Sequence, residues 1–97
     1  MFEQAPRKNG RVFVIKEVKS EPYNGGWLLC FQKVRYVYDN GEVQEGYRFI
    51  WRRPDGSLQA ARGQARIPSL KTARVLMAQS EKEGWGQDDA EATGLFG

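Results

Sequence analysis

The segment Val34–Trp51 reads VRYVYDNGEVQEGYRFIW, and it decides the fold. Two runs rich in β-branched and aromatic residues flank Asn40-Gly41, the strongest short-range signal for a β-hairpin. A type I′ turn needs positive φ at both central residues, which Asn and Gly tolerate best. The segment therefore predicts two antiparallel strands joined by a two-residue turn.

That turn fixes which residues lie opposite each other, and it pairs Lys33 with Arg48 and Cys30 with Trp51. Because side chains alternate between the two faces of a strand, the pairing predicts two different faces. The apolar, aromatic face holds Leu28, Cys30, Val34, Tyr36, Tyr38, Val43, Tyr47, Phe49 and Trp51. The mixed face holds Leu29, Phe31, Lys33, Arg35, Val37, Arg48, Ile50 and Arg52.

The rest of the chain supplies further strands and one helix. Residues 11–19 are a first strand, residues 27–38 and 42–53 form the hairpin, and residues 57–61 are a short fourth strand at an edge. Ser69 is placed to cap a helix and Gly84 to end it. The sequence predicts an α+β fold: an antiparallel meander of three or four strands with one C-terminal amphipathic helix packed on one face. We expect the helix to cover the aromatic face; if it covers the mixed face instead, the aromatic set becomes the binding surface. That set comprises Tyr36, Tyr38, Tyr47, Phe49 and Trp51. The expected contacts join Leu70, Leu76, Met77 and Trp85 to Val34, Tyr47, Phe49 and Trp51.

Length and charge indicate one domain with two tails. We expect a flexible basic arm over residues 1–10, a compact domain over 11–86 and a disordered acidic tail over 87–97. Residues 1–86 hold all fifteen Lys and Arg and nine of the twelve acids, so their formal charge is +6 and that of the tail is −3. This asymmetry favours an anionic partner, or a tail that folds back on the basic surface.

Two hydropathy features bear on location. No apolar run approaches the roughly 20 residues that a membrane span needs, and the N-terminus lacks the apolar segment of a signal peptide. We therefore expect a cytoplasmic protein with no membrane partner.

The absence of histidine and the single Cys30 exclude several chemistries. An intramolecular disulfide, a Cys/His zinc site and histidine-based acid–base catalysis all need residues that this chain lacks. Cys30 falls on the apolar face, where a buried structural thiol is the simpler interpretation. No Walker loop, dinucleotide fingerprint or metal-ligand spacing is present. We expect a non-enzymatic protein without a cofactor or a bound metal.

The mixed face carries the functional hypothesis. Lys33 and Arg48 are predicted to lie directly opposite each other, which costs up to about 1 kcal/mol unless a bound anion lies between them or a carboxylate lies beside them. Cations beside aromatic rings on an open sheet are typical of single-stranded nucleic-acid binders. We therefore hypothesise a binding module that contacts nucleic acid through this face. The candidate residues are Lys33, Arg35, Arg48, Arg52, Arg62 and Arg66.

Two alternatives remain open at this stage. The charges could serve only to keep a sheet face solvated. The module could instead bind a protein partner or form a homodimer, because the same face holds much apolar surface. That surface comprises Trp27, Leu29, Phe31, Val37 and Ile50. In outline, the predicted architecture is similar to the three-stranded, one-helix DNA-binding domains of some integrases and plant transcription factors, which is a likeness of shape alone.

Overall fold

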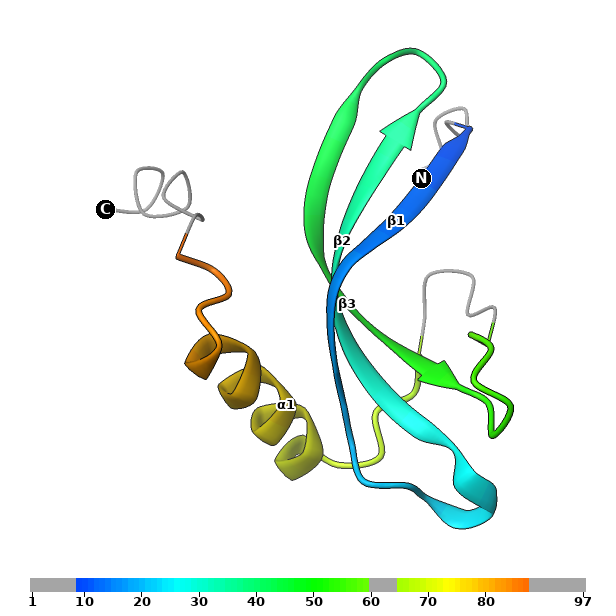
Figure 1. Cartoon of the computed structure of the whole chain (residues 1–97), viewed down its shortest axis with the longest axis vertical. Coiled ribbons are helices and arrows are strands. Elements are labelled where there is room, and N and C mark those ends of the chain that lie inside the picture. Colours follow the sequence, from blue (N-terminus) through cyan, green and yellow to red (C-terminus); the bar gives the residue numbers. More distant parts are fainter. Residues whose placement is uncertain (1–8, 60–64, 88–97) are drawn as a thin grey trace, which may run out of the picture.

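The computed structural model describes residues 9–59 and 65–87 and confirms the α+β fold (Figure 1). Three antiparallel strands, β1 (Gly10–Lys19), β2 (Leu28–Tyr38) and β3 (Val43–Arg52), form one sheet in the order β1-β2-β3. A short 3-10 turn, η1 (Asn24–Gly26), joins the first two strands, and α1 (Leu70–Lys82) follows the sheet. None of the helices in the described ranges is long and apolar enough to cross a membrane.

The predicted fourth strand does not form over the part of it that is described. Leu58 makes only an isolated antiparallel bridge to Arg52. A tight turn over residues 53–57 precedes it. Gly56 has φ +91°, and its N–H donates to the Arg53 carbonyl at 2.8 Å. The expected arm and tail lie almost wholly outside the described residues, and Gly10 already belongs to β1.

The central hairpin forms, but its predicted pairing is wrong by one residue. Val37 lies opposite Val43 and Gln32 lies opposite Arg48, so Lys33 does not oppose Arg48. The loop has three residues rather than two, because the N–H of Tyr38 donates to the carbonyl of Glu42. This is the other common hairpin loop, a type I turn followed by a glycine with positive φ. Gly41 supplies that glycine with φ +93°.

Local and cross-strand contacts both favour the observed pairing. The Asn40 side-chain oxygen accepts from the N–H of Glu42 at 2.9 Å, which stabilises the longer loop. The pairing also places Arg35 opposite Glu45, where they form an ion pair at 2.6 Å. Lys33 then lies opposite Tyr47 instead of a second cation. The unfavourable pair in the predicted register is therefore removed.

A shift of one residue moves every side chain of one strand to the other face. Strand β1 adds its own change, because its register with β2 shifts between Val14 and Lys16. Directly opposite residues share a face, so the pairing gives two sets. The helix face holds Arg11, Phe13, Lys16, Val18, Leu29, Phe31, Lys33, Arg35, Val37, Val43, Glu45, Tyr47, Phe49 and Trp51. The network face holds Val12, Val14, Glu17, Lys19, Leu28, Cys30, Gln32, Val34, Tyr36, Gln44, Gly46, Arg48, Ile50 and Arg52.

Helix α1 has the ends that the sequence predicts. The Ser69 hydroxyl accepts from the N–H of Thr72 at 3.1 Å, as an N-cap does. At the other end Gly84 has φ +94°. The N–H groups of Gly84 and Trp85 donate to the carbonyls of Glu81 and Ser80, the bonding pattern of a Schellman motif. The motif turns Trp85 back onto the sheet.

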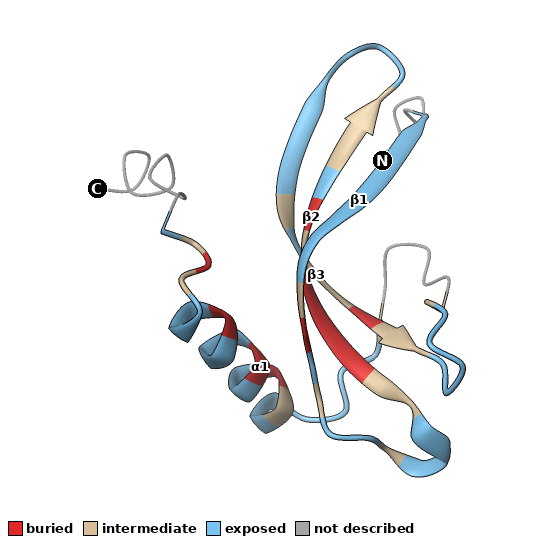
Figure 2. Cartoon of the chain, viewed as in Figure 1, coloured by how far each residue is buried: buried red, intermediate tan, exposed pale blue. Residues whose placement is uncertain are grey.

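The core lies between α1 and one half of the helix face (Figure 2). Its buried members are Val18, Leu29, Phe31, Leu76 and Trp85, with Tyr23, Phe49 and Trp51 packed against them. The predicted contacts of Leu76 and Trp85 are therefore confirmed. Leu70 is 76% exposed, so its predicted place against the sheet is wrong. Met77 is 44% exposed and lines a cleft together with Tyr47. Val34 is buried, but on the network face.

Candidate nucleic-acid interface

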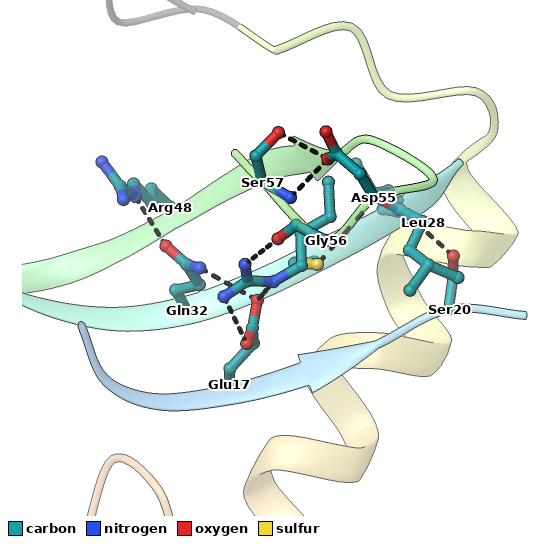
Figure 3. A network of polar contacts seen from close by, with 11 residues as sticks. Glu17, Ser20, Leu28, Gln32, Arg48, Asp55, Gly56 and Ser57 are labelled. Atoms are coloured by element: carbon teal, nitrogen blue, oxygen red, sulfur yellow. Dashed lines mark hydrogen bonds and ion pairs between the residues drawn. The ribbon is translucent and has the colours of Figure 1, made fainter. Parts of the chain in front are cut away.

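A polar network occupies the centre of the network face (Figure 3). The Glu17 carboxylate accepts from Arg52 Nε at 2.8 Å and from Arg52 Nη2 at 3.0 Å. It also accepts from the Gln32 side-chain amide at 3.0 Å. The oxygen of the same amide accepts from Arg48 Nε at 2.8 Å. These contacts join β1 to β3 across a fully buried glutamine of β2.

The ionisation of this network is fixed at neutral pH. Burial alone would raise the pKa of Glu17, but hydrogen bonds from Arg52, Gln32 and Cys30, together with the Arg52 charge, lower it to about 2. Burial, reinforced by the neighbouring Glu17, raises the pKa of the Cys30 thiol to about 12. A buried thiol with such a pKa is not a nucleophile. The network is therefore a structural brace, and its cations already have partners.

The six residues predicted to bind an anion do not share one face. Arg48 and Arg52 lie on the network face and bond to Gln32 and Glu17. Lys33 lies on the helix face. The predicted common basic face of the hairpin is therefore wrong, and the reason is the one-residue shift in register.

The other three predicted residues have different settings. Arg35 shares the helix face with Lys33, although its guanidinium is paired with Glu45. Arg66 is exposed, and its backbone carbonyl accepts from Trp51 Nε1 at 2.8 Å. Arg62 lies outside the described residues.

The half of the helix face that α1 leaves uncovered gathers a different set of cations. In Figure 1 the hairpin tip and the start of β1 extend beyond the helix. Three successive rows of the sheet lie there: Arg11 with Val37 and Val43, Phe13 with Arg35 and Glu45, and Lys16 with Lys33 and Tyr47. We call Arg11, Phe13, Lys16, Lys33, Arg35 and Tyr47 the open patch. It combines four cations with two aromatic rings.

Lys16 and Lys33 are directly opposite each other in adjacent strands. In the described part of the chain neither ammonium group has a carboxylate partner. Like charges in such a pair are destabilising. An anion bound between them would remove the repulsion. The like-charge repulsion that the sequence predicts between Lys33 and Arg48 therefore arises in the structure between Lys16 and Lys33.

Both aromatic rings of the open patch are accessible. Phe13 is 49% exposed and Tyr47 is 38% exposed. The Tyr47 ring stacks on Phe31 with a centroid separation of 5.8 Å, and Phe31 stacks in turn on Trp85 at 5.8 Å. The core therefore supports one ring of the patch from below.

A cleft of about 230 Å³ opens where the open patch meets the end of α1. Phe31, Tyr47, Met77, Ser80, Glu81, Trp85 and Gly86 line it. Three of these residues are aromatic, and Glu81 adds a carboxylate. A planar ring could stack against such walls, and the carboxylate could accept a hydrogen bond from an amino group on its edge.

A larger and shallower depression of about 760 Å³ lies at the far end of the sheet. Its lining is Pro22, Tyr23, Asn24, Gly25, Trp27, Trp51 and Gln59. Among the described residues, its lining side chains are uncharged.

The apolar surface that suggested a protein partner is placed differently from the prediction. Leu29, Phe31 and Ile50 are buried, and Trp27 and Val37 are half-buried. A consecutive run of exposed apolar residues lies instead along β1, and Val43 of β3 is exposed as well. The run consists of Val12, Phe13, Val14 and Ile15.

The described residues contain no group of three or more His, Cys, Asp or Glu side chains that could hold a metal ion. Comparisons with protein-family models, with curated proteins and with solved structures gave no significant match.

Arg11, Phe13 and Lys16 were not predicted from the sequence as members of a site. The apolar run from Val12 to Ile15 hides the alternation of β1, because it shows no inward and outward set. The irregularity after Val14 then reverses the alternation, which places both Phe13 and Lys16 on the helix face. One signal was available. Glu17 needs a cationic partner when it is buried, and pairing it with Arg52 fixes the side on which Lys16 lies.

Proposed function

We propose that this protein is a small non-enzymatic binding module that contacts single-stranded nucleic acid through the open patch. The observation that carries the proposal is the pair Lys16 and Lys33, which lie opposite each other on the half of the helix face that α1 leaves uncovered. A phosphate between the two ammonium groups would turn a repulsive contact into two attractive ones. Arg35, shared with Glu45, and Arg11 extend the positive surface toward the hairpin tip.

The aromatic side chains favour single strands over duplexes. Bases in a duplex are stacked on each other and hide their faces, whereas unpaired bases can stack on protein rings. Phe13 lies in the row next to Lys16 and Lys33, and Tyr47 lies in the same row as the two lysines. Rings beside cations allow a base and its phosphate to be bound together. Such a surface tracks the backbone without reading a defined sequence.

The network face is the weaker candidate for binding an anion, because its arginines are already engaged. Its two arginines are engaged in hydrogen bonds with Gln32 and Glu17. Moving either arginine to a phosphate would take a hydrogen-bond partner from the partly buried Glu17 carboxylate or from the fully buried Gln32 amide. The open patch needs no such rearrangement at Lys16 and Lys33. It is therefore the better of the two basic surfaces for an anionic ligand.

The test compares two double variants that remove the same charge. Lys16→Gln with Lys33→Gln neutralises the centre of the open patch. Lys19→Gln with Lys71→Gln neutralises two exposed lysines elsewhere and is the matched control. Fluorescence anisotropy with a labelled single-stranded oligonucleotide measures affinity at several salt concentrations. We expect the patch variant to bind at least tenfold more weakly at about 50 mM salt. Its salt dependence should also be shallower, because each lost phosphate contact lowers the logarithmic slope by roughly 0.7.

Stability is the second readout. Neutralising Lys16 and Lys33 removes a like-charge contact, so the patch variant should be as stable as the parent or more stable by a few tenths of a kcal/mol. Equal losses of affinity in both double variants would mean attraction by net charge alone. That result, or no binding by the parent protein at about 50 mM salt, would overturn the proposal.

A further inference from the structure

Within the part of the chain that the structure describes, the outer edge of strand β1 is unprotected. Strand β1 ends the sheet, and in residues 9–59 and 65–87 no backbone group bonds to its outer side. Val12, Phe13, Val14 and Ile15 are consecutive, and each is between 40% and 49% exposed. Soluble proteins usually protect such an edge with a charge or a proline. This stretch has neither, and the register irregularity comes only after Val14.

The backbone pattern shows which groups face outward. The N–H of Asp39 donates to the carbonyl of Asn9 at 2.8 Å. In an antiparallel pair the bonded residues recur at every second position, so residues 9, 11 and 13 bond to β2. The N–H and C=O groups of Gly10, Val12 and Val14 therefore point away from the sheet. These three positions are symmetric about Val12.

We propose that two copies of this chain associate through β1, antiparallel, with a two-fold axis at Val12. Val12 then opposes its own copy and Gly10 opposes Val14, which gives on the order of six backbone hydrogen bonds. Two-fold pairing uses the same surface on both partners. The two three-stranded sheets become one continuous sheet.

Side-chain chemistry selects this register over its neighbours. With the axis at Val12, Arg11 of each copy lies beside Phe13 of the other, which allows a cation to contact a ring. A shift of the axis toward the N-terminus would oppose Arg11 to its own copy, an unfavourable like-charge contact. With the axis at Phe13, the only backbone hydrogen bonds between the copies would link Val12 with Val14. Gly10 would then oppose residue 16, whose backbone groups bond to β2. The Val12 register therefore gives the most bonds without opposed charges.

A second copy explains the patch of exposed side chains better than an unrelated strand does. The straight edge is short, because it ends at the irregularity after Val14. Symmetric pairing uses all of it on both partners. It also brings the two open patches together on one side of the joint sheet, since Arg11 and Phe13 of both copies lie at the junction.

Sedimentation equilibrium of the full chain over a range of concentrations tests this inference. Val12→Lys would place an ammonium group against its symmetry mate at the axis and should abolish the dimer. Val43→Lys is the control, because Val43 is also an exposed valine of the same sheet, at the opposite edge. We expect a reversible dimer for the parent and for Val43→Lys, and a monomer for Val12→Lys. A monomeric parent at several hundred micromolar, or a dimer that is lost only in Val43→Lys, would overturn the inference.

A cross-link provides an independent measurement. Opposed bonded positions in an antiparallel pair have Cα atoms about 5.5 Å apart, within the range that a disulfide spans. Val12→Cys should therefore form an intermolecular disulfide under mild oxidation, and Val43→Cys should not. The native Cys30 does not interfere, because it is buried. Equal cross-linking of both variants would indicate random collision and contradict the proposed axis.

Discussion

Replacing Glu17 by glutamine tests the polar network that fixes the sheet register. The substitution keeps the size of the side chain but removes its charge. One of the two carboxylate oxygens becomes an amide that cannot accept. Because both oxygens accept from Arg52, at least one of these bonds is replaced by a contact between two donors. The variant should therefore be less stable than the parent at neutral pH.

The pKa gives the magnitude. A lowering from the ordinary 4.5 to about 2 corresponds to roughly 3 kcal/mol, at about 1.4 kcal/mol for each pKa unit. Solvent reaches part of the pair, since the side chains of Arg52 and Glu17 are 23% and 14% exposed. Screening reduces the effect, and we expect a loss of about 2 kcal/mol at pH 7.

The pH dependence has a definite sign. Glu17 binds its proton less tightly in the folded state, so its contribution to stability is complete above pH 4.5 and is lost as the pH falls toward 2. The difference between parent and variant should be constant from pH 7 to about pH 5.5 and should shrink below that. Other carboxylates titrate in both proteins and cancel in the difference.

Urea unfolding at a series of pH values measures both quantities. Glu45→Gln is the matched control, because Glu45 also pairs with an arginine but both side chains are more than 40% exposed. Exposed pairs contribute little, so that variant should lie within about 0.5 kcal/mol of the parent. A loss below about 0.5 kcal/mol for Glu17→Gln at pH 7, or an equal loss at pH 7 and pH 3, would refute the reasoning.

Three further changes test the core, the backbone and the thiol. Leu76→Ala should cost about 3 kcal/mol in urea unfolding because Leu76 is 1% exposed, whereas Leu70→Ala should cost under about 0.5 kcal/mol; equal costs would contradict the observed helix orientation. Gly84→Ala should cost about 1 kcal/mol because φ is +94°, whereas Gly46→Ala, whose added methyl would meet no atom within 4 Å, should be neutral or stabilising. A thiol reagent should leave Cys30 unmodified in the native protein and modify it fully in denaturant, since the pKa is about 12 and the side chain is buried; rapid native labelling would show that the network face opens.

Local signals in the sequence predicted most of the fold. The Asn40-Gly41 hairpin, the Ser69 cap and the Gly84 terminus each depend on a few adjacent residues whose backbone preferences are specific. All three form in the structure. The class, the strand order of a meander and the C-terminal helix follow from them.

The register could not be obtained from the same signals. Asn-Gly suits a two-residue loop and also a three-residue loop that ends in a glycine with positive φ. Contacts far apart in the sequence choose between them, such as Arg35 with Glu45 and Glu17 with Arg52. Because one residue of shift exchanges the faces of a strand, the predicted site was divided between both sides of the sheet. Lys33 and Arg35 share one face, as predicted, and their cross-strand neighbours on β1 are Lys16 and Phe13.

The most direct test of the central claim is an amide chemical-shift titration with a short single-stranded oligonucleotide at a fixed protein concentration. If the open patch is the binding surface, the shifts should be sensitive to salt and should cluster within it, whereas Gln32 and Arg48 should shift little. The residues expected to shift are Arg11, Phe13, Lys16, Lys33 and Arg35. Shifts centred on the network face, or spread over all cations and lost at about 150 mM salt, would contradict the account.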